Sequence, residues 1–107
     1  MTFMVKREDL EKIEKLGAAL KEAGIKVKTL YLYGSRVKGK AGRDSDLDVA
    51  IVSEDFSGDL TADLKSILPA LKKSDAAIEP VFYRPEDFRE EDPLVWEIQH
   101  SGVKVTG

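Results

Sequence analysis

The sequence contains no cysteine and only one histidine. Without cysteine the chain forms no disulfide framework and no cysteine-built zinc site. No stretch approaches the roughly 18 continuous apolar residues that a membrane-spanning helix needs. The first residues also lack the long apolar run of a signal peptide. From these absences we expect a cytoplasmic protein.

A surplus of positive charge is also missing. The 107 residues carry a net charge of −3 at pH 7, and the sequence pI is about 5.2. A protein whose whole surface binds nucleic acid is normally basic, so nucleic acid is not the expected partner, although a local basic patch is compatible with this composition. The length suits a single domain, residues 1–107, with one modest core.

Helical and strand patterns alternate along the chain. Apolar residues recur at helical spacing in some segments, and runs of β-branched, leucine and tyrosine residues predict strands in others. Besides one short helix after the first strand, we expect helices at Arg7–Ala23, Ser57–Lys73 and Leu94–His100 and strands at Val27–Tyr33, Leu47–Val52, Ala77–Tyr83 and Val103–Val105. This order predicts an α+β (α/β) fold, a small mixed β-sheet with helices packed on one face.

Glycine and proline mark the ends of these elements. Gly24 is placed to end the first helix, and Pro69 should kink or end the helix that contains it. Pro80 lacks an N–H, which predicts a strand end or an edge strand. Asp92 followed by Pro93 is typical of a helix start.

Two aspartates open the second predicted strand. Side chains alternate between the faces of a strand, so Asp46 and Asp48 should point the same way. Neighbouring carboxylates repel each other unless a cation lies between them, and Mg²⁺ is typically bound by one or two carboxylates together with substrate phosphates. The pair therefore indicates a magnesium site. The alternative is a role in turns and caps, which is commoner for an isolated Asp-x-Asp.

A glycine turn ends the first predicted strand. Gly34 can adopt a backbone geometry that other residues avoid, and Ser35 can offer its hydroxyl and backbone N–H to a phosphate. By itself, Gly-Ser after a strand is more often an ordinary turn. Here ten residues separate it from the aspartate pair, so a phosphate site and metal ligands would converge where two strand ends lie side by side.

These two motifs resemble those of a known family. Residues 34–39, Gly-Ser-Arg-Val-Lys-Gly, and residues 45–51, Ser-Asp-Leu-Asp-Val-Ala-Ile, resemble the polymerase-β-like nucleotidyltransferases. Within that superfamily the chain is most similar to the minimal nucleotidyltransferases that are often encoded beside HEPN-domain proteins. Residues 78–81 and the tail 96–103 are similar as well, but they are less specific.

The resemblance implies a role for each motif residue. Gly34, Ser35 and Arg36 would bind the triphosphate of the nucleotide. Asp46 and Asp48 would be catalytic and would bind two Mg²⁺ ions. The expected reaction transfers a nucleotidyl group, AMP if the donor is ATP, from Mg-NTP to an acceptor hydroxyl, for which a partner HEPN protein is one candidate.

A third acidic residue completes such sites in the family. It lies on the next strand and is usually Asp, and Glu79 occupies the matching position here. Glu79 would thus be the third catalytic and metal-binding residue. Asp75 is the rival candidate, although it precedes the apolar run and suits a turn.

Two other functions remain open beside transfer to a HEPN partner. One is a catalytically weak, antitoxin-like module that neutralises a HEPN protein by contact alone. Such a module would tend to lose the motif residues, and all of them are present here. The other is transfer to a small molecule, as in enzymes that modify aminoglycosides, which usually carry an additional domain.

Aromatic residues and the single histidine have simpler expected roles. Trp96 should lie in the core or in a subunit interface, which would make a partner protein or a second copy of this chain its neighbour. Tyr31 and Tyr33 should pack between sheet and helix, with base stacking as the alternative. His100, near the end of the last helix, is expected to be structural.

Overall fold

The computed structural model describes residues 6–34, 37, 46–74 and 77–106. Its elements are α1 (Arg7–Glu22), β1 (Val27–Tyr33), β2 (Leu47–Ser53), α3 (Leu60–Lys73), β3 (Ile78–Tyr83), the 3-10 turn η1 (Pro85–Asp87), α4 (Pro93–Ser101) and β4 (Val103–Thr106). The expected element order is confirmed within these ranges, whereas the short helix after β1 lies outside the described residues except for Val37. No helix in the described part is long and apolar enough to cross a membrane.

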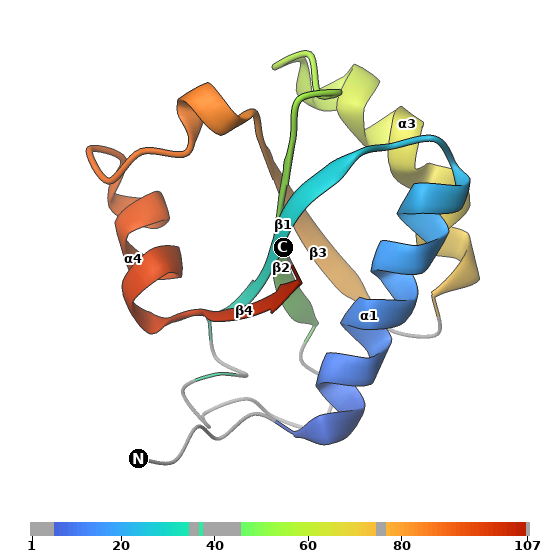
Figure 1. The fold of residues 1–107 in the computed structure, drawn as a ribbon, viewed down its shortest axis with the longest axis horizontal. Helices are drawn as coiled ribbons and strands as arrows, with labels where there is room; N and C mark the ends of the chain where they lie inside the picture. The colour runs from blue at the N-terminus through green and yellow to red at the C-terminus, as the bar shows by residue number, and fades with distance from the viewer. Residues whose placement is uncertain (1–5, 35–36, 38–45, 75–76, 107) are drawn as a thin grey trace.

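The four strands form one mixed sheet in the order β3-β2-β1-β4 (Figure 1). β1 is antiparallel to both β2 and β4, whereas β2 and β3 are parallel. The predicted pairing of the first two strands is confirmed, with Leu30 opposite Ile51 and Tyr33 opposite Asp48. The end of β1 and the start of β2 are therefore neighbours, as the two motifs require.

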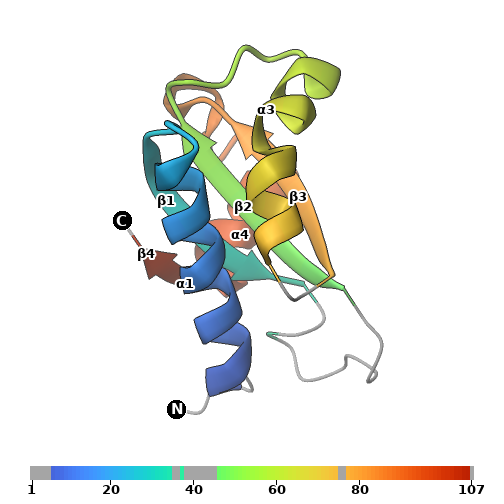
Figure 2. The same ribbon diagram turned by 90° about the vertical axis from the view of Figure 1, so that its right-hand side faces the viewer.

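Helices α1 and α3 cover one face of the sheet (Figure 2). The strands turn alternate residues toward them, so Leu30, Val49 and Ile51 lie in the same fully buried core as Leu16 of α1 and Ile67 of α3. Burying an aliphatic side chain of this kind contributes about 1.5–3 kcal/mol. This layered arrangement of sheet and helices confirms the predicted fold class.

Helix α4 differs from the expectation, because it lies on the opposite face of the sheet (Figure 1). There Ile98 is fully buried and packs with Ala50 of β2 and Tyr33 of β1. Tyr33 is thus enclosed between sheet and helix, as predicted. The sheet has apolar residues on both faces, so one layer of helices cannot cover it.

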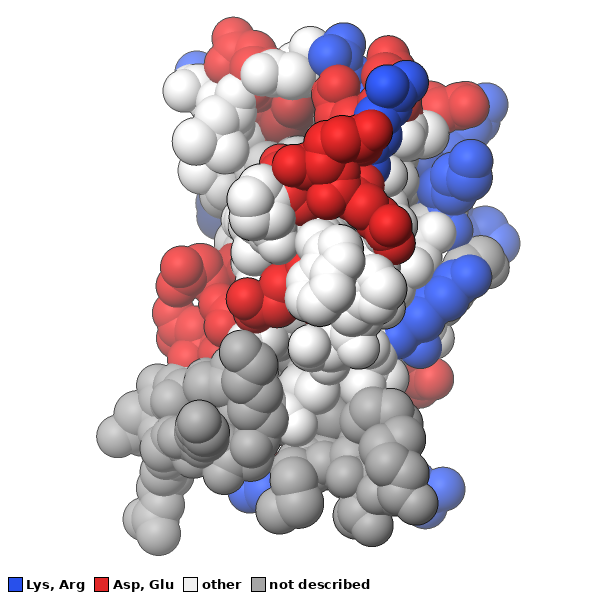
Figure 3. All heavy atoms as spheres, turned by 90° about the vertical axis from the view of Figure 1, so that its left-hand side faces the viewer, with Lys and Arg blue, Asp and Glu red and all other residues white. Residues whose placement is uncertain are grey.

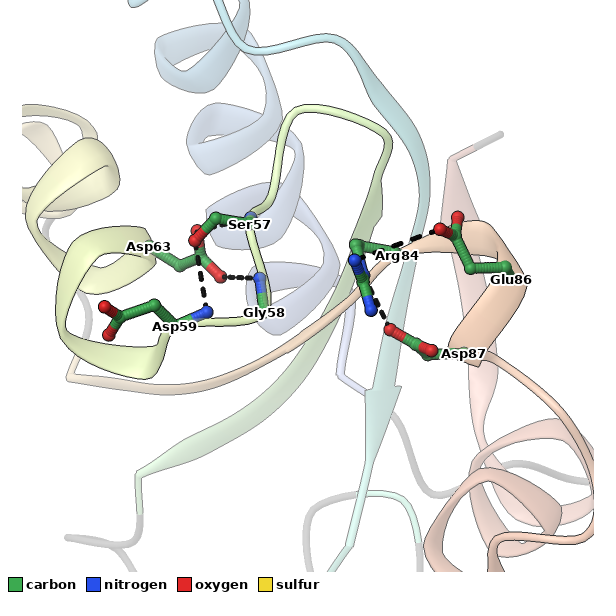
Figure 4. Close-up of polar contacts among 7 residues, drawn as sticks. All are labelled: Ser57, Gly58, Asp59, Asp63, Arg84, Glu86 and Asp87. Carbon is green, nitrogen blue, oxygen red and sulfur yellow. Dashed lines mark hydrogen bonds and ion pairs between the residues drawn. The ribbon is translucent and has the colours of Figure 1, made fainter.

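Local hydrogen bonds define the helix ends. Gly24 has a φ of +86°, and its N–H and that of Ile25 donate to Lys21 and Leu20, both at 3.0 Å, which caps α1 as the sequence predicts. Buried Asp63 of α3 accepts hydrogen bonds from the Ser57 N–H and hydroxyl and from the next N–H, at 2.8, 3.0 and 3.1 Å (Figure 4). The Asp92 side chain caps α4 as predicted, at 2.9 Å from the Leu94 N–H.

Pro69 lies inside helix α3. The alternative that the helix ends at Pro69 is wrong, because α3 continues to Lys73. Pro69 itself is exposed, while buried Ile67 and Ala70 hold the helix against the core on either side of it. Packing thus outweighs the roughly 3 kcal/mol that an interior proline costs.

Pro80 confirms the expected edge position of its strand, since β3 is an outer strand of the sheet. The Leu47 N–H donates to the Ala77 carbonyl at 2.9 Å. The N–H and C=O groups of successive residues point to alternate sides of a strand, so those of Ala77 face β2 and those of Pro80 face away from it. On that outer side of the sheet the missing N–H of proline leaves no ladder hydrogen bond unmade.

Candidate active site

Three strands place a row of polar side chains on the face of the sheet that carries α4. Asp48 of β2 lies opposite Tyr33 of β1 and opposite Glu79 of β3. Directly opposed residues on neighbouring strands share a face, so the three side chains are neighbours. Leu47 and Val49, on either side of Asp48, are buried in the core under α1 and α3. The alternation therefore fixes Asp48 on the α4 face.

Gly34 touches this row directly. Its φ of +82° is a left-handed conformation that suits glycine. A Cβ at this position would overlap an Asp48 carboxylate oxygen and lie 3.1 Å from the Asp48 Cγ. Glycine is therefore required at position 34 for two reasons, the left-handed backbone angle and the close approach of Asp48. The structure places Gly34 of the first motif against Asp48 of the second.

Asp48 lies among other carboxylates. Partial burial raises its pKa above the ordinary value, and Glu79, Asp46 and Glu97 raise it further through charge repulsion. Burial also raises the pKa of Tyr33 to about 12, with the charge of Asp48 as the next cause. The Tyr33 hydroxyl therefore stays protonated at neutral pH. A cation at Asp48 would relieve this repulsion.

The predicted acidic residues differ in how the structure places them. Asp46 is exposed and directly precedes β2, Asp48 is half-buried, and Glu79 is exposed on β3. Asp48 and Glu79 are in register, but the described residues contain no group of three acidic or histidine side chains that could hold a metal ion. The metal site formed by Asp46, Asp48 and Glu79 therefore stays a prediction.

Three other candidates lie outside the described residues. They are Ser35 and Arg36 of the predicted phosphate site and Asp75, the rival third acid. Their predicted roles stay predictions.

Glu97 is the residue that sequence reasoning missed. It lies on α4 and is close enough to Asp48 and Tyr33 to raise both pKa values. Its neighbour Ile98 is buried against the sheet. The sequence predicted the helix that contains Glu97 but not its position. Glu97 can be recognised as part of the site only once α4 is known to pack on the face that carries Asp48.

Trp96 does not lie in the core, and that part of the expectation is wrong. The side chain is 51% exposed, and its ring stacks on His100 with the centroids 4.2 Å apart. Nε2 of His100 also lies 3.1 Å from a Glu90 carboxylate oxygen. These contacts agree with a structural role for the histidine.

Comparison with known proteins decides the family. The family model described as "Nucleotidyltransferase domain" matches residues 13–105, which include both motifs. The chain belongs to this nucleotidyltransferase domain family. The family region runs from Ile13, within α1, to Val105, within β4. The row of Tyr33, Asp48 and Glu79 therefore lies in a nucleotidyltransferase domain.

A curated relative supports a narrower resemblance over a short stretch. The domain is 63% identical over 27 residues to "Probable protein adenylyltransferase MntA" of Haemophilus influenzae. The match covers 25% of this nucleotidyltransferase domain and 24% of that protein. The match thus spans about a quarter of each chain.

Two solved structures share the fold of this nucleotidyltransferase domain. One is the crystal structure, at 1.40 Å, of a protein described as a nucleotidyltransferase from Sulfolobus solfataricus, with a TM-score of 0.62 and 13% identity. The structural alignment covers 89% of this chain and 77% of the Sulfolobus solfataricus chain. The other is the toxin–antitoxin MntA–HpeT in a double Asp-to-Glu mutant form, with a TM-score of 0.57 and 18% identity over 88% of this chain and 72% of that chain. Both likenesses establish the fold.

Proposed function

We propose that this domain transfers AMP from Mg-ATP to a hydroxyl group of a HEPN-class partner protein. The observation that supports the proposal best is the contact of Gly34 with Asp48, which in turn lies in register with Glu79. The glycine turn that would bind phosphate thereby adjoins the carboxylates that would bind metal. The relative's name, a protein adenylyltransferase, supports AMP and a protein acceptor. The toxin–antitoxin neighbour supports a paired partner.

The donor atoms suit Mg²⁺. Asp48 and Glu79 offer two carboxylates in register, and Asp46 is close enough to raise the pKa of Asp48. Mg²⁺ typically takes one or two carboxylates and completes its octahedron with phosphate and water. We therefore assign Asp46, Asp48 and Glu79 as ligands of two ions. When bound, such ions lower the pKa of the attacking hydroxyl and neutralise charge on the triphosphate.

The chain's own groups would orient the nucleotide. Gly34 leaves the Asp48 carboxylate uncovered on its side, and Ser35 and Arg36, which follow it, would donate hydrogen bonds to phosphate oxygens. Protonated Tyr33 beside Asp48 can donate a hydrogen bond within the same row. These contacts would position the donor, while the acidic residues would bind the metal ions on which transfer depends.

Incubation with α-labelled ATP, Mg²⁺ and a HEPN-domain partner tests the proposal. Label should appear on the partner protein. Glu79→Gln should leave Mg-ATP binding largely intact and lower the transfer rate strongly, because an interaction of the transition state is removed while ground-state binding survives. Asp48→Asn should damage both binding and transfer. Glu54→Gln, an exposed acid beyond the far end of β2, is the matched control.

The possible outcomes separate the candidate functions. Transfer at the wild-type rate by Glu79→Gln would refute its catalytic role, and a loss of transfer in Asp75→Asn would give that role to Asp75. A stable complex with the partner, without transfer of label under any condition, would favour the antitoxin-like module that acts by contact alone.

A further inference from the structure

Helix α4 presents a large aromatic side chain to solvent. Trp96 is half exposed, and the stacked His100 ring accounts for part of its covered surface. Tryptophan is the residue type most enriched in the energetic centres of protein interfaces, together with tyrosine and arginine. An exposed tryptophan on helix α4 therefore suggests a contact with another molecule.

The segment before α4 is strongly acidic. Residues 84–92 contain five carboxylates and two arginines, an excess of three negative charges that equals the net charge of the whole chain. Within this segment Arg84 contacts Asp87 at 2.8 Å and Glu86 at 3.9 Å (Figure 4). Its positive charge is thus already neutralised by its own neighbours.

The acidic residues and the tryptophan share one side of the molecule. Figure 3 looks onto the α4 side, where acidic side chains lie above and to the left of a group of uncharged ones and most of the visible Lys and Arg lie toward the right-hand edge. A shallow hollow in this region is lined by Phe88, Arg89, Glu90, Glu91, Trp96 and Gln99. Glu90 and Glu91 are both exposed. The hollow therefore combines an aromatic ring with carboxylates that solvent can reach.

We propose that this hollow binds an arginine-rich segment of a partner protein, with a guanidinium group over Trp96 and ion pairs to Glu90 and Glu91. A guanidinium stacks on an aromatic face by a cation–π interaction and also pairs with carboxylates, so arginine suits both features better than lysine does. Nucleic acid is the wrong occupant, because its phosphates would face the acidic excess of residues 84–92.

This inference concerns binding and goes beyond nucleotide transfer. It nevertheless places the partner near the candidate site, because Glu97, next to Trp96 on α4, is close to Asp48. A bound segment would lie along α4, the helix that also carries Glu97 beside the carboxylate row. Its binding can be measured without ATP or Mg²⁺, so failure of the transfer reaction would leave the inference intact.

The single tryptophan makes the test direct, since all tryptophan fluorescence comes from Trp96. A synthetic peptide of alternating glycine and arginine should bind the full chain saturably and change this emission. A Gly-Lys peptide should bind more weakly, while a Gly-Ser peptide and oligouridylate should not bind. Anisotropy of a labelled Gly-Arg peptide should show about two- to fivefold weaker binding to Trp96→Ala.

Matched pairs of charge variants distinguish binding at this hollow from a general attraction of the peptide to the negative net charge of the chain. Glu90→Gln with Glu91→Gln should weaken binding of the Gly-Arg peptide roughly fivefold. Glu11→Gln with Glu14→Gln removes the same charge from exposed positions of α1, on the other side of the sheet, and should have little effect. Equal weakening by both pairs, unchanged Trp96 emission on peptide binding, or equal or tighter binding of oligouridylate would each overturn the proposal, as would the absence of any peptide binding.

Discussion

Replacing Gly34 by alanine should separate its backbone role from its contact with Asp48. The alanine backbone must adopt a φ of +82°. Its Cβ also meets the Asp48 side chain, at 3.1 Å from the Asp48 Cγ and 3.4 Å from the Asp48 Cβ. Gly24 provides the matched control, because its φ is +86° and nothing lies within 4 Å of the Cβ that alanine would add. The two substitutions share the backbone strain and differ in the contact.

The magnitudes follow from this difference. The left-handed conformation costs an alanine about 1–2 kcal/mol, which is the expected loss for Gly24→Ala. Gly34→Ala adds an overpacking cost of about 1–3 kcal/mol. A domain of this size loses roughly 4–8 °C in Tm per kcal/mol, so Gly34→Ala should melt at least about 4 °C below Gly24→Ala. If Asp48 instead rotates away, its carboxylate leaves the row and Mg-ATP binding should fall.

Thermal unfolding of the two variants, with and without Asp48→Ala, measures the contact as a double-mutant cycle. Removing the Asp48 carboxylate leaves only a Cβ at 3.4 Å from the new methyl group, an ordinary contact. Gly34→Ala should then cost no more than Gly24→Ala, with a coupling of about 0.5–3 kcal/mol. The reasoning is refuted if Gly34→Ala is as stable as Gly24→Ala and also binds Mg-ATP normally.

Three further predictions concern charge, titration and packing. Without metal and nucleotide, Asp48→Asn should stabilise the fold by roughly 0.2–1 kcal/mol at neutral pH, as measured by urea unfolding, because like charges on opposed strands repel. Because the pKa of Asp48 is raised, its ionised form destabilises the fold at pH values above that pKa. The stability gained by Asp48→Asn should therefore shrink as the pH falls through the pKa of Asp48. A gain that does not change with pH would contradict charge repulsion as the cause. Tyr33, with a pKa of about 12, should stay mostly protonated at pH 11, as measured by the difference in near-ultraviolet absorbance between the wild type and Tyr33→Phe. Stability should fall between about pH 10 and 12, because the unfolded chain releases this proton first. Ile67→Ala should cost about 2–5 kcal/mol, whereas Leu64→Ala, at a 37% exposed position of the same helix, should cost clearly less in the same assay; equal costs would argue against the orientation of α3.

Much of the architecture could be predicted because its determinants are local. The spacing of apolar residues predicted the order of helices and strands, and Gly24 and Asp92 marked helix ends through hydrogen bonds to residues a few positions away. Pro80 marked an edge strand because it lacks an N–H. The Gly-Ser turn and the aspartate pair likewise predicted a shared location, since two consecutive strands that pair antiparallel bring these ends together.

Other features could not be read from local patterns. Leu60, Leu64 and Leu68 fit the helical period of α3, yet they are 69%, 37% and 39% exposed, while Ile67 is fully buried. A wide apolar stripe does not specify which part of it meets the core, because that depends on the neighbouring α1 and sheet. Trp96 is exposed for a related reason, since Val95 and Ile98 already provide the buried face of α4.

The sequence by itself determined the order of the described helices and strands and the family motifs, and it put forward Asp46 and Asp48 as the first two acidic residues of the candidate site. Only the tertiary structure decided which side chains meet. The parallel register of β2 and β3 aligns Asp48 with Glu79, and the packing of α4 on the second face brings Glu97 near them. Spacing along a chain constrains hydrogen bonds between near neighbours, whereas strand register and helix placement are set by contacts between segments that are distant in sequence.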